Sequence, residues 1–312
     1  MTELYGKIKV VTNDLKVHTF VEDLLNFEPS RKFPGSGENG VIGICVEPKS
    51  GNVIASLVYE DKGAIKNKVI RIKSKNGLEA SSSETIIDNI PSVRAAHQIQ
   101  AITIGFDGKL YVNVGDGMVS ETVQDDDDLR GKILRMNLDG SIPKDNPNSG
   151  SFIFAKGFRN PFGAAWRKSN KSLYISDNGP LSDDRLAKVE AGKNYGWPKS
   201  IRQNSIFWWQ LTQAPTAIDF SQSGEFPGKF NDQLFVNLFG GVYAQGRSVK
   251  GKKMVKIQLD ENDKVVSYDE FVTYIGNGPA SPCGLSFGPG GLYFSDLFGE
   301  NGKGSIYKIK AR

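Results

Sequence analysis

Hydrophobic and polar residues alternate over short runs in this chain, and the runs are separated by turn residues, as is typical of β-hairpins. One unit recurs: a short apolar strand, a turn rich in Gly, Asp or Pro, and a second strand that ends in Asp or Gly. Clear copies begin at Val41 (VIGICVEPKSGNVIASLVYE), Ala101 (AITIGFDGKLYVNVGDG), Gly163 (GAAWRKSNKSLYISDNGP) and Cys283 (CGLSFGPGGLYFSDLFG). A weaker copy, FNDQLFVNLFGGVYA, lies in the longer interval between the third and the fourth.

The copies are about 60 residues apart, which is the length that a unit of four strands needs. Radial units of this kind limit the number of exposed strand edges. The pattern therefore predicts an all-β fold, a six-bladed β-propeller with four-stranded antiparallel blades, as a single domain over residues 1–312. Only VEDLLNF from Val21 and RLAKVEAG from Arg185 predict helix, each of one or two turns.

Composition agrees with this fold and narrows the range of partners. The 35 Gly and 14 Pro residues favour tight turns. The net charge of +4 is scattered along the chain, which argues against nucleic-acid binding. No apolar run reaches the length of a membrane span, and MTELYGKIKVV lacks the apolar core of a signal peptide. Cys45 and Cys283 are expected to be buried free thiols.

Two histidines are present, and only one stands where loops of a propeller gather. His18 lies in the alternating strand KVHTF, where a surface or edge position is expected. His97 lies in RAAHQIQ, just before a strong strand, and loops of this kind meet on one face of the fold. A lone loop histidine is more often structural than catalytic, so a role for His97 depends on what else converges there.

Other polar candidates follow or precede strands. Arg159 and Asn160, in GFRNPFG, offer donors suited to carbonyl and carboxylate oxygens. Asp116 ends the strand VNVGDG, where it either orients a base or caps a turn. No Walker A, G-x-G-x-x-G after a strand, H-E-x-x-H or G-x-S-x-G motif is present, so nicotinamide, ATP and α/β-hydrolase functions lack their usual support.

The segment SDNGPLSDDR is a candidate calcium site, because it places acidic side chains around a Gly-Pro turn. The alternative is an acidic turn stabilised by its own side-chain-to-backbone hydrogen bonds. A weaker candidate, QDDDDLRG, matches no EF-hand spacing and is more simply solvated charge.

The order of these segments resembles one family. NGVIGICVEP, then HQ with IGFDGKLYVNVGDG, then LRGKILRMNLDGSIPKDNP, GFRNPFGAAW, SDNGPLSDD and AGKNYGWP follow each other as in the glucose/sorbosone dehydrogenases. The resemblance covers about Gly6 to Trp197 and continues faintly to the C-terminus. Members are six-bladed propellers, typically exported, and several use pyrroloquinoline quinone (PQQ) with calcium to oxidise the anomeric carbon of aldoses to lactones.

The resemblance implies a role for each candidate. His97 would take the proton from the sugar hydroxyl, with Asp116 supporting it. Arg159 and Asn160 would bond the quinone oxygens, and Asn178 would also contact the cofactor. The substrate would lie near Glu38 and Gln98. The calcium ligands would come from the Gly-Pro turn: Gly179, Pro180, Asp183 and Asp184. A sugar or alcohol substrate, an external electron acceptor and an extracytoplasmic location are implied in the same way.

Several positions depart from the family pattern. Glu38 replaces a glutamine, Arg185 replaces an acidic calcium ligand and Phe158 replaces a histidine. The lysine and two arginines of PQQ-binding members correspond to Phe239, Ser281 and Cys283, all neutral. PQQ carries three carboxylates, which need cations when buried. Arg247 or Lys250, in the basic stretch QGRSVKGKK, are candidates to replace them.

The N-terminal segment TELYGKIKVV resembles the middle of the family's first blade, so that blade is expected to lack a strand unless the C-terminal SIYKIKA pairs there.

Three hypotheses of function stay open. The first is a quinone-dependent sugar or alcohol dehydrogenase, favoured by His97, Arg159 and Asn160. The second is a binding or scaffold module without cofactor, favoured by the missing cations. The third is a calcium-dependent lactone hydrolase, supported only by the acidic Gly-Pro turn.

Overall fold

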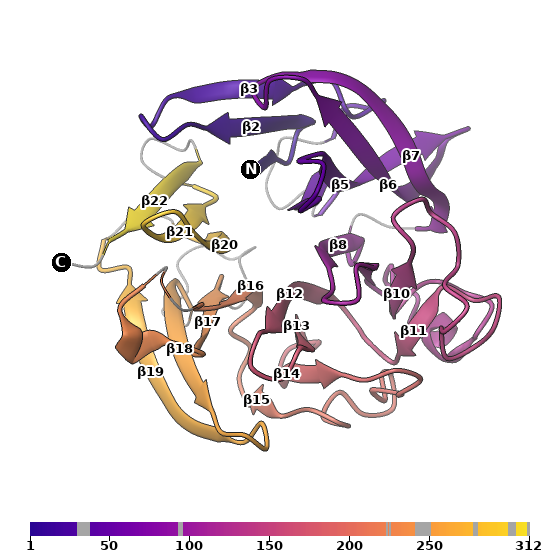
Figure 1. Ribbon diagram of the computed structural model, residues 1–312. Helices are drawn as coiled ribbons and strands as arrows, with labels where there is room; N and C mark the ends of the chain where they lie inside the picture. Colours follow the sequence, from indigo (N-terminus) through magenta and orange to yellow (C-terminus); the bar gives the residue numbers. More distant parts are fainter. Residues whose placement is uncertain are drawn as a thin grey trace. The chain divides into compact units, whose positions relative to one another are not determined.

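The computed structural model describes residues 1–29, 38–92, 96–222, 224, 226–240, 251–276, 280–298 and 304–310. They form two compact units. The first comprises Met1–Pro161 with Ala191–Pro198, and the second comprises Phe162–Glu190 with Lys199–Arg312. The strands, labelled in Figure 1, form six sheets, and each sheet is made of strands that follow one another along the chain.

The first unit contains three of the sheets. The first sheet has three strands: β1 (Thr2–Glu3), β2 (Lys7–Val11) and β3 (Val17–Val21). The second has four: β4 (Val41–Val46), β5 (Val53–Asp61), β6 (Ala64–Ser74) and β7 (Ala80–Pro91). The third also has four: β8 (Ile99–Ile104), β9 (Leu110–Val114), β10 (Lys132–Met136) and β11 (Ile153–Lys156). A 3₁₀ helix, η1 (Ser120–Gln124), lies between β9 and β10.

The second unit contains the other three sheets, the first of which starts at the boundary between the units. That sheet is β12 (Pro161–Arg167), β13 (Ser172–Asp177), β14 (Asp184–Val189) and β15 (Phe207–Trp209). The next is β16 (Pro215–Phe220), β17 (Leu234–Leu238), β18 (Lys253–Leu259) and β19 (Val265–Thr273). The last is β20 (Pro282–Gly288), β21 (Gly291–Asp296) and β22 (Ser305–Ile309). A 3₁₀ helix, η2 (Gly228–Phe230), precedes β17.

This is the all-β six-bladed propeller class that the sequence predicts, with antiparallel blades of four strands except the first and the last, which have three. The shorter first blade agrees with the expectation from TELYGKIKVV, while Ser305–Ile309 of the C-terminal segment form β22 and pair with β21 in the last sheet. All five hairpin copies found in the sequence contribute strands. In the described part of the chain no helix is long and apolar enough to cross a membrane.

The two helical predictions are wrong. In RLAKVEAG, residues up to Val189 form β14, which is hydrogen-bonded between β13 and β15. In VEDLLNF, Val21 ends β3, and the next residues run irregularly while Leu24 and Leu25 pack on the core of the first two sheets. Both segments are too short to form a stable helix alone, so sheet pairing and burial override their weak periodicity.

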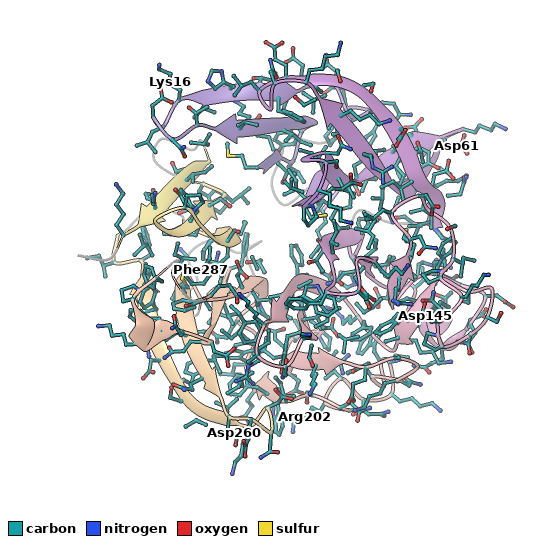
Figure 2. The ribbon with its side chains drawn as sticks, viewed as in Figure 1. Lys16, Asp61, Asp145, Arg202, Asp260 and Phe287 are labelled. Atoms are coloured by element: carbon teal, nitrogen blue, oxygen red, sulfur yellow. The ribbon has the colours of Figure 1, made fainter. Side chains whose placement is uncertain are left out.

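Apolar side chains pack between consecutive sheets. In the first unit one core joins sheets one and two and another joins sheets two and three. The second unit has its own cores, one of which gathers phenylalanines around Phe235. Charged residues at hairpin tips and in loops of the first unit, such as Lys16, Asp61 and Asp145, extend into solvent (Figure 2). Cys45 and Cys283 are free thiols, and burial raises the pKa of each to about 12.

A hydrogen bond repeated from sheet to sheet ties neighbouring blades together. A polar side chain on the second strand of a sheet donates to a backbone carbonyl on the first strand of the next. Ser56 Oγ donates to the Gln100 carbonyl at 2.8 Å and Asn113 Nδ2 to the Pro161 carbonyl at 3.0 Å. In the second unit Ser176 donates to Pro215 and Asn237 to Gly284.

The first strand of several sheets bends where it accepts this hydrogen bond. Backbone carbonyls at the bend lack a partner in their own sheet, so they need a donor from the neighbouring sheet. The register shifts between Val41 and Ile44, between Ile99 and Ile102, and between Pro282 and Leu285. A glycine is needed at position 43 of the first of these bends, because a Cβ on Gly43 would lie 2.3 Å from the Gln100 carbonyl oxygen. Side-chain donors therefore replace the backbone bonds that the bend removes.

Replacing Asn113 by Ala should destabilise the protein by about 1–3 kcal/mol, because the buried Pro161 carbonyl loses its donor. Asn148→Ala is the matched control, since Asn148 is exposed in a turn. Urea unfolding of the two variants measures the difference. Equal midpoints would show that the inter-sheet bond does not contribute.

Candidate functional site

His97 is held against the turn that follows β9. Its backbone has a φ of 57°, in the left-handed region, and its carbonyl accepts a hydrogen bond from the Gly117 N–H at 3.0 Å. Gly115 passes so close that a Cβ there would lie 2.4 Å from the His97 carbonyl oxygen. The glycines of VNVGDG thus bring the two segments together, although they are far apart in the sequence.

This contact places the imidazole beside Asp116. His97 Nδ1 lies 2.6 Å from Asp116 Oδ1, and both side chains are buried. A carboxylate is an acceptor, so Nδ1 carries the proton in the neutral ring and Nε2 carries the lone pair. Nε2 makes no hydrogen bond with any residue that the structure describes. The structure therefore brings His97 and Asp116 together, with the carboxylate on the Nδ1 side of the ring.

Three further hydrogen bonds hold Asp116 in place. The Met118 N–H donates to Oδ1 at 2.9 Å, and the indole Nε1 of Trp197 donates to Oδ2 at 2.8 Å. The Asp116 N–H donates to the Arg159 carbonyl at 2.7 Å. Burial alone would raise the pKa of Asp116, but the His97 hydrogen bond and charge, together with these donors, outweigh it and hold the pKa below its usual value. Asp116 is thus a stable anion next to His97.

Trp197 contacts both Asp116 and Arg159, and the sequence alone did not identify it as a site residue. Its ring stacks under the Arg159 guanidinium, with 5.7 Å from Cζ to the ring centroid, while its N–H binds Asp116. The backbone of Trp197 is anchored by its N–H to the Gly157 carbonyl, and its own carbonyl accepts from Gln124. The only signal in the sequence was the presence of AGKNYGWP among the family segments.

Glu38 and Asn160 form a second polar group next to His97. Asn160 Nδ2 donates to Glu38 Oε1 at 2.9 Å, and Gln100 Nε2 donates to Glu38 Oε2 at 2.5 Å. Glu38 Oε2 also accepts from the backbone N–H of Gln98, the residue after His97, at 3.2 Å. The side chain of Gln98 is used elsewhere, since its Oε1 accepts from Ser92. Gln98 thus contributes its backbone to this group, and Gln100 contributes the amide that the sequence reading overlooked.

The predicted calcium residues lie in the second unit, and their side chains do not fit a metal ion. Asp184 is buried, and its two oxygens accept from four donors: Gly179 N, Thr212 Oγ1, Gln213 N and Ala214 N. Burial raises the pKa of Asp184, although these donors oppose the shift. Both Asp184 oxygens are therefore engaged in holding two loops together.

The neighbouring charges are paired internally as well. Asp183 pairs with the exposed Arg202 at 2.7 Å. Arg185 and Asp177 form a fully buried ion pair, with Nη2 2.8 Å from Oδ2. The described residues hold no group of three or more Asp, Glu, His or Cys side chains that could bind a metal. The hydrogen bond from the Gly179 N–H to Asp184 is of the side-chain-to-backbone kind that the alternative to a metal site expects. Asn178 and Pro180 lie on the loop after β13.

The weaker calcium candidate, QDDDDLRG, is followed directly by Lys132, whose ammonium binds backbone carbonyls at this loop. The buried Lys132 Nζ donates to the carbonyls of Val123 and Arg130, both at 2.8 Å. Burial lowers the pKa of Lys132 to about 8. Asp126 and Asp128 pair with Lys156 and Arg130. The Lys132 ammonium thus lies against two carbonyls of this loop, while Asp126 and Asp128 face other cations.

The positions expected to pair with the carboxylates of PQQ carry neutral side chains: Phe239, Ser281 and Cys283. Phe239 is buried after β17, and its carbonyl accepts from Ser281 Oγ at 3.4 Å. Cys283 is a thiol within β20. Arg247 and Lys250 lie outside the described residues. The described residues therefore fit the carbonyl end of a quinone, at Arg159 and Asn160, but offer no cations at the positions expected for its carboxylates.

The chain is similar to known proteins both in sequence and in fold. The chain is 30% identical to aldose sugar dehydrogenase YliI of Escherichia coli over 178 residues, which cover 48% of each chain. It is 33% identical to quinoprotein glucose dehydrogenase B of Acinetobacter calcoaceticus over 196 residues, which cover 52% of this chain and 40% of the relative. The matches thus span about half the length of these relatives.

A solved structure shares the fold. The PQQ-bound aldose sugar dehydrogenase of Streptomyces coelicolor matches with a TM-score of 0.77 at 22% identity, over 97% of this chain and 87% of that one. The model of the glucose/sorbosone dehydrogenase family matches residues 1–277. These findings agree with the order of segments and with the fold described above, and the chain belongs to the glucose/sorbosone dehydrogenase family.

Proposed function

We propose that this protein is a quinone-dependent oxidoreductase that oxidises the anomeric hydroxyl of an aldose sugar to a lactone. The observation that carries the proposal is the buried His97–Asp116 pair, whose 2.6 Å contact leaves the Nε2 lone pair of His97 available as a base. Quinoprotein sugar dehydrogenases among its relatives support the same reaction class. The proposal extends to a sugar or alcohol as substrate, an external electron acceptor and an extracytoplasmic location.

The reaction removes one proton and one hydride from the sugar. His97 Nε2 takes the proton of the anomeric hydroxyl as the C–H bond breaks, and the Asp116 carboxylate stabilises the resulting imidazolium. Asp116 can do this because its pKa lies below the usual range, so it stays ionised. A bound quinone supplies the two-electron acceptor for the hydride, and Arg159 and Asn160 would hold its carbonyl oxygens.

No step is assigned to calcium, because Asp184 is engaged with hydrogen-bond donors and Asp183 with Arg202. No observation on the described residues specifically favours a calcium-dependent lactone hydrolase. The second candidate function is a binding module without cofactor. It is favoured by one observation, the neutral character of Phe239, Ser281 and Cys283, since three carboxylates cannot be buried without compensating charge.

Adding PQQ to the purified protein should produce dye-linked oxidation of aldoses. His97→Ala should lower this rate by a factor of about 10² to 10⁴, because the proton acceptor is lost. His18→Ala is the matched control, since His18 lies on β3 away from the site and should leave the rate unchanged. Calorimetry with PQQ reports binding separately from turnover. Absence of quinone binding would exclude the dehydrogenase and leave the binding module.

Trp197→Phe should lower kcat about tenfold and move the acid limb of the kcat/KM profile to higher pH. The variant keeps an aromatic ring under Arg159 but removes the donor to Asp116 Oδ2, so more of the carboxylate charge acts on His97 and makes it more basic. Trp208→Phe is the control, because Trp208 stacks on Arg202 in the second unit. An unshifted profile would mean that Trp197 only fills space.

The melting temperature should be the same in millimolar calcium chloride and in excess chelator. A ligand that binds only the folded state raises the melting temperature. The carboxylates of Asp183 and Asp184 are already engaged, with Arg202 and with backbone donors respectively, so no such rise is expected from calcium. Differential scanning calorimetry at constant ionic strength measures this. A calcium-dependent rise would restore the Gly179–Pro180 turn as a metal site.

A further inference from the structure

A short segment between β14 and β15, Ala191–Pro198, belongs to the first unit, although the residues on both sides of it belong to the second. This segment, the strap, follows the edge of the third sheet. The Tyr195 N–H donates to the Lys156 carbonyl at 2.7 Å, and the Lys156 N–H donates to the Lys193 carbonyl at 3.1 Å. The Tyr195 ring stacks on Phe158, with 4.6 Å between the ring centroids. The middle of the strap is therefore held by β11 and the residues that follow it.

The end of the strap carries Trp197 and is held by a different segment, the connection between β9 and β10. The indole Nε1 of Trp197 donates to Asp116 Oδ2 at 2.8 Å, and the Trp197 carbonyl accepts from Gln124 Nε2 at 2.6 Å. Asp116 lies at the start of this connection, and Gln124 ends η1 within it. One connection thus binds both the side chain and the main chain of Trp197.

The hydrogen bonds of Gln124 fix the orientation of its amide. Oε1 accepts from Asn194 Nδ2 at 2.6 Å, while Nε2 lies 3.3 Å from Asn194 Oδ1 in addition to its bond with the Trp197 carbonyl. The opposite orientation would place Oε1 against that carbonyl, so that two acceptors would face each other. Asn194 Oδ1 also accepts from the Gly196 N–H at 2.9 Å. The two amides together tie η1 to the strap directly beside Trp197.

The position of the indole matters because of the charge that it helps to hold. Burial would raise the pKa of Asp116, and the donors around the carboxylate, Trp197 among them, keep the pKa below its usual value. An indole N–H that moves away from Oδ2 leaves more of the carboxylate charge to act on His97. The Trp197 N–H is bound to the Gly157 carbonyl at 3.1 Å, which fixes one side of the residue. The other side is fixed by Gln124.

We propose that Gln124 is a positioning residue for the base: by holding the main chain of Trp197, it keeps the indole N–H on Asp116. The position of that N–H sets how strongly the carboxylate acts on His97. The inference rests on the proposed function, in which His97 takes the proton of the sugar, and deepens it. Gln124 acts through Trp197, since its printed side-chain bonds go to the strap and not to the carboxylate or the imidazole.

Gln124 is uncharged, so its replacement by methionine removes the donor without changing any charge. The charged side chains around His97, Trp197 and Gln124 stay in place: Asp116, Glu38, Arg159, Arg130, Lys132 and Lys156. A change in the pH dependence of such a variant therefore reports a change in geometry.

The first test is the pH profile of kcat/KM for PQQ-linked aldose oxidation. Gln124→Met should lower kcat about tenfold and move the acid limb to higher pH, in the direction expected for Trp197→Phe and no further. The double variant Gln124→Met/Trp197→Phe should have the profile of Trp197→Phe alone, because the donor that Gln124 positions is then absent. An unchanged profile in Gln124→Met, or shifts that add in the double variant, would overturn the proposal.

Controls separate positioning from a general loss of stability. Gln233 forms the same kind of bond in the second unit, with Nε2 donating to the Lys229 carbonyl at 3.0 Å. Gln233→Met should lower the urea midpoint of unfolding, as Gln124→Met does, but should leave the pH profile in place. Gln124→Ala removes the same donor without filling the space and should shift the profile as methionine does. An equal shift in Gln233→Met would show that the effect is not specific to Gln124.

A second measurement needs neither quinone nor turnover. The indole N–H resonance of Trp197, identified by its loss in Trp197→Phe, should exchange with deuterium oxide about tenfold faster in Gln124→Met than in the wild type, because its contact with Asp116 opens more often. Gln233→Met should leave this rate unchanged. Unchanged exchange in Gln124→Met would overturn the positioning role even in an active enzyme. Faster exchange in a protein that oxidises no sugar with PQQ would support the Gln124–Trp197 contact and overturn the dehydrogenase.

Discussion

The hydrogen bond from the second strand of one sheet to the bent first strand of the next is the constraint on which the rest of the structure depends. Each bend shifts the register and leaves carbonyls without a partner in their own sheet. Buried serine and asparagine side chains supply the donors, from Ser56 to Gln100 and from Asn113 to Pro161. The sheets are thereby linked by specific polar contacts in addition to apolar packing.

The same constraint positions the candidate site. Asn113 holds the Pro161 carbonyl, directly after Arg159 and Asn160, while Asp116, three residues beyond Asn113, binds the Arg159 carbonyl through its N–H. The turn after β9 also clamps His97, whose imidazole then meets the Asp116 carboxylate. A single hairpin end therefore brings together the base, its carboxylate and the donors, and Trp197 locks them from a separate loop.

Buried charge is compensated within the protein at the places where a calcium ion was expected. Arg185 neutralises Asp177, four donors satisfy Asp184, and Lys132 fills the loop of the acidic run QDDDDLRG. A buried carboxylate needs a cation or several donors, and either can take the place of a metal. By contrast, the described partners of Glu38 are neutral: the amides of Gln100 and Asn160 and the backbone N–H of Gln98.

The sequence by itself determined the repeated hairpin units and the family, and it identified His97, Asp116, Arg159, Asn160 and Glu38 as candidate residues. It could do so because alternation and turn residues act over a few positions, and because the order of motifs is read along the chain. Only the tertiary structure decided that VEDLLNF and RLAKVEAG are not helical, since sheet pairing and burial outweigh short-range periodicity. It also decided the partners of each charge: Asp184 with backbone donors, Asp183 with Arg202, and Trp197 with Asp116. Apart from the Gly179 N–H on Asp184, those contacts join residues 19 to 81 positions apart, and no local pattern fixes which donor will face a given carboxylate.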